Sequence, residues 1–147
     1  MGDSAFGSPA NNLVGFFANS TAVQNMHMVW GFQMTGITNP ANITGANFFA
    51  DATRLGSGYN LDVHVVRTAA TNTVLASAYE TSAGLLTPNY TTGIRVGSLD
   101  SGGQTSLATY LQNNWTPGDF VFLSIQTDPL TLSGTNNFFT FDAAAQL

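Results

Sequence analysis

The chain of 147 residues has no lysine, no cysteine and only three basic residues, all of them arginine. Lysine and arginine make most protein contacts to phosphate groups, so their scarcity argues against nucleic acid as a partner. The net charge of −5 argues against other polyanions as well. The absence of cysteine excludes disulfide bonds within the chain and metal sites with thiolate ligands.

Charged residues of all kinds are also scarce, at 7% of the chain, where about a quarter is usual. The surface must therefore be covered mainly by Asn, Thr, Ser, Gln and Gly. Such a surface is typical of extracellular modules and of subunits packed in assemblies, so we expect an extracellular or cell-surface location. No apolar run approaches the roughly 20 residues of a membrane-spanning helix, and we expect no membrane insertion. We expect no secretory signal at Met1.

Hydrophobic residues make up 44% of the chain, which predicts a globular protein, and its length predicts one domain over residues 1–147. Catalytic side chains are few. The chain has two histidines, Glu80 is its one glutamate, and no G-x-S-x-G motif occurs. Paired-carboxylate or nucleophilic chemistry therefore has little support, and we do not expect an enzyme.

Short β-like runs separated by Gly, Asn, Pro and Thr dominate the sequence. In one of them Met28, Trp30 and Phe32 alternate with smaller or polar residues, which predicts a strand with Trp30 in the core. The strands that we expect are Asn12–Ala18, Met26–Met34, Thr44–Ala52, Tyr59–Arg67, Thr73–Glu80, Thr91–Leu99, Phe120–Thr127 and Asn136–Asp142.

One segment predicts a helix. Thr105 or Ser106 can cap it, its apolar face holds Leu107, Tyr110 and Leu111, and it ends at Asn113-Asn114. Glycines predict turns with positive φ at two places, Gly56-Ser57-Gly58 and Ser101-Gly102-Gly103. The fold class that we expect is all-β, an antiparallel β-sandwich (jelly roll) with one short helix.

The order of the motifs also resembles a known family. The quoted runs are Gly31-Phe32-Gln33-Met34-Thr35-Gly36-Ile37, Ile43-Thr44-Gly45-Ala46-Asn47-Phe48 and Leu61-Asp62-Val63-His64-Val65-Val66, followed by the predicted helix. They resemble the DNRLRE-type jelly-roll domains of secreted bacterial and archaeal proteins, a group that includes alginate-binding carbohydrate modules. The resemblance implies a jelly roll that binds carbohydrate without catalysis.

The chain departs from that family's pattern in three places. Gln33 stands where the family has an acidic residue, the family's first strand has no counterpart before Gly2, and the last strand stops near Leu147. Trimmed ends would explain the last two departures. A subunit that completes its sheet with a strand from a neighbour would explain them as well.

Aromatic and basic side chains are the candidates for sugar binding. Tyr90 and Trp115 lie among loop residues, where their rings could stack on a sugar; the alternative is that they pack in the core. Arg54, Arg67 and Arg95 could each bind a uronate carboxylate in a bidentate fork. The alternative for the arginines is an ion pair, for example between Arg67 and Glu80.

Metal ligands are only weakly indicated. Asp62 and His64 share one strand face, and His27 and Asp51 could complete a site if the strands align; the alternative is a polar surface. We expect no cofactor, and a structural calcium ion stays open because several aspartates lie near turns, namely Asp3, Asp100, Asp119, Asp128 and Asp142.

Two functions remain. The first is a carbohydrate-binding or adhesive module, with a polysaccharide as its partner. The second is a self-assembling structural subunit of an extracellular filament or viral-type shell, joined to like subunits through its sheet edges. The second is suggested by adjacent phenylalanines, because such a pair sends one ring to each face of a strand and one core can absorb only one of them; the pairs are Phe16-Phe17, Phe48-Phe49 and Phe138-Phe139.

Overall fold

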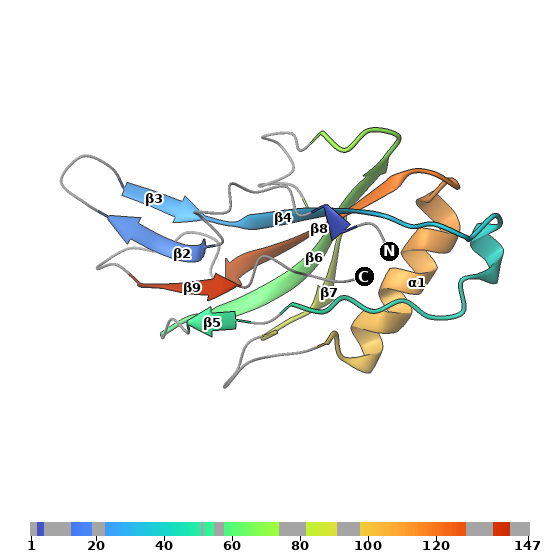
Figure 1. Ribbon diagram of the computed structural model, residues 1–147. Coiled ribbons are helices and arrows are strands. Elements are labelled where there is room, and N and C mark those ends of the chain that lie inside the picture. Colours follow the sequence, from blue (N-terminus) through green and yellow to red (C-terminus); the bar gives the residue numbers. More distant parts are fainter. Residues whose placement is uncertain are drawn as a thin grey trace.

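The protein is mostly β-structure with one α-helix (Figure 1). The computed structural model describes residues 3–4, 13–18, 23–50, 52–54, 58–73, 82–90, 98–128 and 137–141, and side chains within 27–50, 58–73, 82–90, 98–128 and 139–140. The described strands are β1 (Asp3–Ser4), β2 (Leu13–Ala18), β3 (Val23–Met26), β4 (Met28–Gln33), β5 (Ala52–Arg54), β6 (Asn60–Ala69), β7 (Gly84–Thr87), β8 (Phe120–Asp128) and β9 (Asn137–Phe141). A 3₁₀-helix, η1 (Pro40–Asn42), and the α-helix α1 (Ser101–Asn114) complete the elements.

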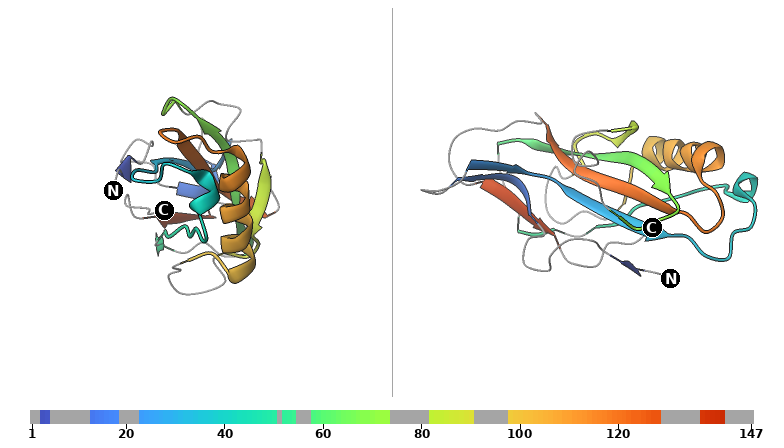
Figure 2. Two further views of the ribbon diagram at one scale, coloured as in Figure 1. Left: turned by 90° about the vertical axis from the view of Figure 1, so that its right-hand side faces the viewer. Right: turned by 90° about the horizontal axis from the view of Figure 1, so that it is seen from above.

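The strands form two antiparallel sheets. One has the order β1-β4-β8-β6-β7 and the other the order β3-β2-β9-β5. Helices α1 and η1 lie at one end of the molecule, and the second sheet lies toward the other (Figures 1 and 2). The mostly β, antiparallel architecture with one helix agrees with the sequence-based prediction.

The main core lies on one face of the first sheet. Trp30 on β4, Leu123 on β8 and Val65 on β6 are register partners, and their exposed fractions are 1%, 0% and 2%. The prediction that Met28, Trp30 and Phe32 share a core-facing side of their strand is therefore confirmed. The same core extends to Leu107 and Leu111 of α1 and to Phe139 of β9, so both sheets and the helix share it.

The other face of the first sheet carries a smaller apolar cluster of Val29, Val66 and Phe122. The Phe122 ring lies over Gly31, where an added Cβ would come within 2.9 Å of the ring. The guanidinium of Arg67 lies 4.1 Å from the centroid of the same ring. Gly31 thus makes room for a large ring at the centre of this face, and Arg67 covers it.

The helix begins earlier than predicted. It starts at Ser101, and Asp100 caps it by accepting a hydrogen bond of 2.7 Å from the backbone N–H of Gly103. The prediction that Ser101-Gly102-Gly103 forms a turn with positive φ was wrong. Gly103 instead allows α1 to pack closely against β7, because a Cβ there would lie 2.8 Å from the carbonyl oxygen of Leu86 on that strand. The helix ends at Asn114, as predicted.

The predicted strand Thr44–Ala52 was also wrong over residues 44–50, while Ala52 belongs to β5. Residues 43–50 form no ladder and make one isolated bridge, between Phe49 and Ser98. Side chains take the place of a strand partner: Gln112 donates to the carbonyl of Ile43 at 2.6 Å, and Asn47 accepts from the backbone N–H of Leu99 at 3.0 Å. Strands β1, β3 and β7 were not predicted, and β5 shares only Ala52 with a predicted strand. The predicted strands Thr73–Glu80 and Thr91–Leu99 fall largely outside the described residues.

Candidate functional site

Tyr90, one of the two rings predicted to stack on a sugar, lies in the core with 3% of its surface exposed. Its hydroxyl accepts from the backbone N–H of Ala50 at 3.1 Å and lies 3.3 Å from the carbonyl of the same residue, to which it donates. Its ring centroid is 6.1 Å from that of Phe48. Tyr90 therefore anchors segment 43–50 and presents no ring face to a ligand.

Trp115, the other predicted stacking ring, is also 3% exposed and packs in the main core. Its backbone N–H bonds to the carbonyl of Leu111 at 3.0 Å, and its indole N–H donates to the carbonyl of Asp119 at 2.8 Å. The ring thus joins the end of α1 to the turn that leads into β8. The alternative that both rings belong to the core is what the structure shows, and the stacking assignment is corrected accordingly.

Arg67 is the predicted carboxylate-binding residue whose side chain is described. One Nη donates to the carbonyl of Thr73, and the guanidinium rests on Phe122. Its contacts therefore tie the segment that follows β6 back to the strand and cover the Phe122 ring of β8. Arg54 lies on β5, but its side chain is outside the described set, as are Arg95 and Glu80. The predicted pairing of Arg67 with Glu80 is therefore not tested.

Polar side chains gather where β6 pairs with β7. His64 Nδ1 lies 2.7 Å from the hydroxyl of Ser82, and Asp62 accepts from the backbone N–H of Asn89 at 3.0 Å. Asn89 has a φ of 53°, so a short polar residue suits this turn. In the part of the chain that the structure describes, no three His, Cys, Asp or Glu side chains come together in a way that could hold a metal ion. Asp51, the proposed fourth ligand, lies outside that part.

The His64 imidazole gives a testable pH dependence. Burial lowers its pKa below the ordinary 6.5; Asp62 acts in the opposite direction, and His27 lowers the pKa further. Below pH 6.5 the unfolded chain therefore binds a proton more readily than the folded one. We expect the free energy of unfolding to fall as the pH drops from about 7 through the lowered pKa of His64.

Urea unfolding between about pH 5.5 and 8 measures this effect, since most aspartates stay ionised over that range. In His64→Gln the slope with pH should be shallower than in the wild type, while Ser82→Ala should retain the histidine's part of it. An identical slope in His64→Gln and wild type would show that this imidazole does not titrate differently on folding.

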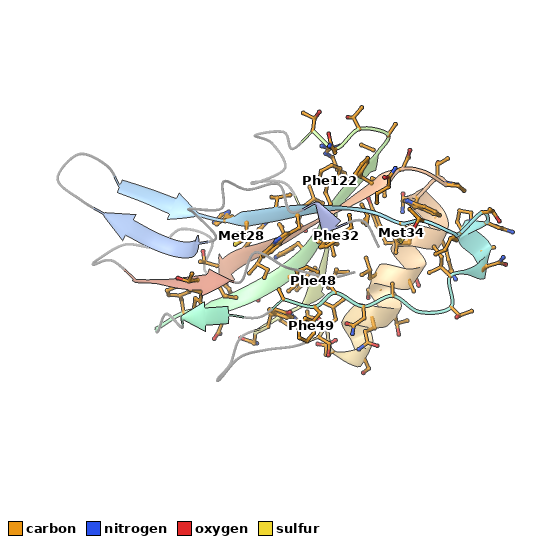
Figure 3. The ribbon with its side chains drawn as sticks, viewed as in Figure 1. Met28, Phe32, Met34, Phe48, Phe49 and Phe122 are labelled. Carbon is orange, nitrogen blue, oxygen red and sulfur yellow. The ribbon has the colours of Figure 1, made fainter. Side chains whose placement is uncertain are left out.

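Phe49 and Leu85 are the large apolar side chains that stand exposed among those described, at 44% and 49%. Phe48, the neighbour of Phe49, is 0% exposed, and the two rings lie on opposite sides of their segment (Figure 3). The prediction that a phenylalanine pair sends one ring away from the core is thus confirmed for this pair. Phe16, Phe17 and Phe138 have side chains outside the described set.

Phe49 belongs to a surface without charged residues, which we call the charge-free surface and define as the exposed residues of 33–50 and 101–118. Neither stretch contains Asp, Glu, Lys, Arg or His. The Gln112–Ile43 hydrogen bond ties the two stretches together, and Asn47 also bonds to Leu99, two residues before the second stretch begins. Figure 2 shows η1 and α1 at the same end of the molecule. Its exposed hydroxyl and amide side chains include Thr44, Asn47, Ser101, Thr105, Ser106, Thr109, Gln112 and Asn113.

The charge-free surface was not identified from the sequence, although two signals for it were present. The Phe48-Phe49 pair indicated that one ring would face outward, and the absence of charge over 33–50 and 101–118 can be read directly. Segment 33–50 was expected to include a strand of the sheet, and the sequence-based prediction placed no site on it. None of the helices in the described ranges is long and apolar enough to cross a membrane. No protein-family model, curated protein or solved structure matches the chain.

Proposed function

We propose that the chain is a non-catalytic carbohydrate-binding or adhesive module that works outside the cell or at its surface. The observation that carries the proposal is the charge-free surface, where an exposed phenylalanine ring stands among amide and hydroxyl groups. A sugar offers apolar C–H faces and hydroxyl groups, so a ring beside hydrogen-bonding side chains provides for both. Neutral polar groups also suit a partner that carries no fixed charge.

The proposal includes the finer description of the fold as an antiparallel β-sandwich of jelly-roll type. It is supported by the two antiparallel sheets and by their shared core, in which Trp30 of the first sheet and Phe139 of the second belong to one cluster. A sandwich of this kind can present a ligand-binding surface without a conformational change. The module needs no cofactor for the binding chemistry proposed.

The second candidate is a self-assembling structural subunit of an extracellular filament or viral-type shell. Specific support comes from Phe49 and Leu85, two half-exposed apolar side chains in a chain with few charges to keep copies apart. Leu85 lies on β7, the last of the described strands in the five-stranded sheet, so a neighbour that paired with this strand would lie beside it.

Two measurements separate these functions. The full chain is applied to a glycan array, and its mass is measured by light scattering over a concentration series with and without Ca²⁺. We expect a monomer that binds a subset of glycans. A defined oligomer or fibre that binds none of them would contradict the proposal and favour the structural subunit. A mass that changes only when Ca²⁺ is present would point to a calcium-dependent subunit contact.

A further inference from the structure

We infer that Phe49 is the ring on which a sugar stacks, and that the charge-free surface selects neutral polysaccharides over acidic ones. This inference rests on the proposed function and makes it more specific, because it names both the contact residue and the class of glycan. It differs from the expectation set by the family resemblance, which points to alginate, a polymer of uronates.

The position of Phe49 is fixed by its neighbours. Phe48 is fully buried beside Trp30, with ring centroids 5.5 Å apart, and the backbone of Phe49 itself bridges to Ser98. On the next residue, Ala50 is held by its two hydrogen-bonding contacts with the hydroxyl of Tyr90. The exposed ring therefore stands on an anchored backbone, and little conformational entropy is lost when a ligand covers it.

Hydrogen-bonding groups lie close to this ring. Asn47 is exposed two residues before Phe49, and its side-chain oxygen accepts from Leu99, which orients its amide nitrogen as a donor. Ser98, the bridge partner of Phe49, is exposed as well, and α1 begins at Ser101, another exposed hydroxyl. A pyranose on the Phe49 ring would find donors and acceptors at its rim.

The charges on and beside the charge-free surface determine which class of glycan it can bind. No cationic side chain occurs in 33–50 or 101–118, and Asp100, which is exposed at the start of α1, adds a carboxylate beside the surface. Arg67, the arginine whose side chain is described, rests on Phe122 and bonds to Thr73. A uronate would lose water from its carboxylate without gaining a cation from either of these two stretches, and it would meet a chain of net charge −5. A neutral glycan meets neither obstacle.

Affinity gel electrophoresis of the full chain tests the inference, with laminarin, starch and galactomannan as neutral probes and alginate as the acidic one. The wild type should be retarded by at least one neutral glycan and not by alginate. Phe49→Ala should weaken the retarding interaction roughly tenfold, the effect of about 1.4 kcal/mol of aromatic contact, whereas Phe49→Tyr should keep most of it. Leu85→Ala is the matched control, since it removes an apolar side chain of similar exposure from β7, and it should bind like the wild type.

The outcomes separate the inference from the proposed function. Binding that persists in Phe49→Ala, or that favours alginate, overturns the inference and leaves a carbohydrate-binding module with its site elsewhere. Equal losses in Phe49→Ala and Leu85→Ala also overturn it, because they indicate unspecific apolar adsorption. Failure to bind any glycan, on the gel and on the array, overturns the inference together with the proposed function. Circular dichroism spectra identical to that of the wild type confirm that each surface variant is folded.

Discussion

Replacing Trp30 by alanine is expected to lower the free energy of unfolding by about 3–5 kcal/mol. The ring is 1% exposed and packs against Phe48 at a centroid distance of 5.5 Å. Its register partner on β8 is Leu123, which is 0% exposed, so the surrounding strands cannot collapse into the space without breaking their ladder. A loss of this size is a large part of the roughly 5–15 kcal/mol that stabilises a domain.

The measurement is the urea midpoint of the wild type, Trp30→Ala and Trp30→Phe. Trp30→Phe keeps an aromatic ring and should lose markedly less stability than Trp30→Ala. If Trp30→Ala does not accumulate as folded protein, a clear destabilisation of Trp30→Phe still tests the assignment. Wild-type stability in both variants would show that β4 does not present this residue to the core.

Replacing Gly103 by alanine should destabilise the protein by about 1–3 kcal/mol, although alanine is the better helix former by about 1 kcal/mol. The added Cβ would lie 2.8 Å from the backbone oxygen of Leu86 and against the hydroxyl of Thr87. The backbone of β7 is held by its ladder with β6, so the helix has to move away from the strand. That shift would also disturb the contact that places α1 beside segment 43–50.

Gly102→Ala is the matched control for this prediction, since it makes the same chemical change one residue earlier in the same helix. A Cβ there meets only the side-chain oxygen of Asp100, at 3.3 Å, and Gly102 is exposed. Thermal unfolding should leave Gly102→Ala near the wild type and lower the midpoint for Gly103→Ala. Equal midpoints for the two variants would contradict the close packing of α1 on β7.

Strand β6 was predicted from side chains that alternate between core and more polar positions over most of its length. Leu61, Val63 and Val65 on β6 follow period 2 and are 0%, 0% and 2% exposed. Period 2 identifies such strands without knowledge of their partners, because one face must be buried. Strand β7 has no such pattern: it reads Gly-Leu-Leu-Thr, and its place in the sheet depends on β6 and α1. Only the tertiary packing distinguishes it from a loop.

The start of α1 was missed for a related reason. Glycines usually mark turns, and the local sequence Ser101-Gly102-Gly103 is typical of one. The need for Gly103 arises from β7, which approaches from another part of the chain. Asp100 was an available signal, since aspartate is a preferred N-cap residue, but the glycines that follow it argue against a helix when they are considered locally.

The predicted site residues show how far neighbouring residues can indicate exposure. Tyr90 and Trp115 stand among Asn, Pro and Thr, which correctly indicated irregular structure, but both rings turn back into the core. An aromatic ring in a loop is often what fastens the loop, as the hydroxyl of Tyr90 does at Ala50. Phe49, by contrast, belongs to a pair of which one ring was predicted to face outward, and it does so at 44% exposure, although its segment is not the strand that the argument assumed.

Chemical-shift mapping tests the account of the charge-free surface most directly. ¹H–¹⁵N spectra of the labelled full chain are recorded during titration with the neutral glycan that retards it most. We expect the largest shifts at the backbone amides of residues 44–50 and 98–106, around Phe49, Ser98 and the start of α1. Shifts centred instead on β6 and β7, around His64 and Leu85, would contradict the assignment of the charge-free surface as the binding site.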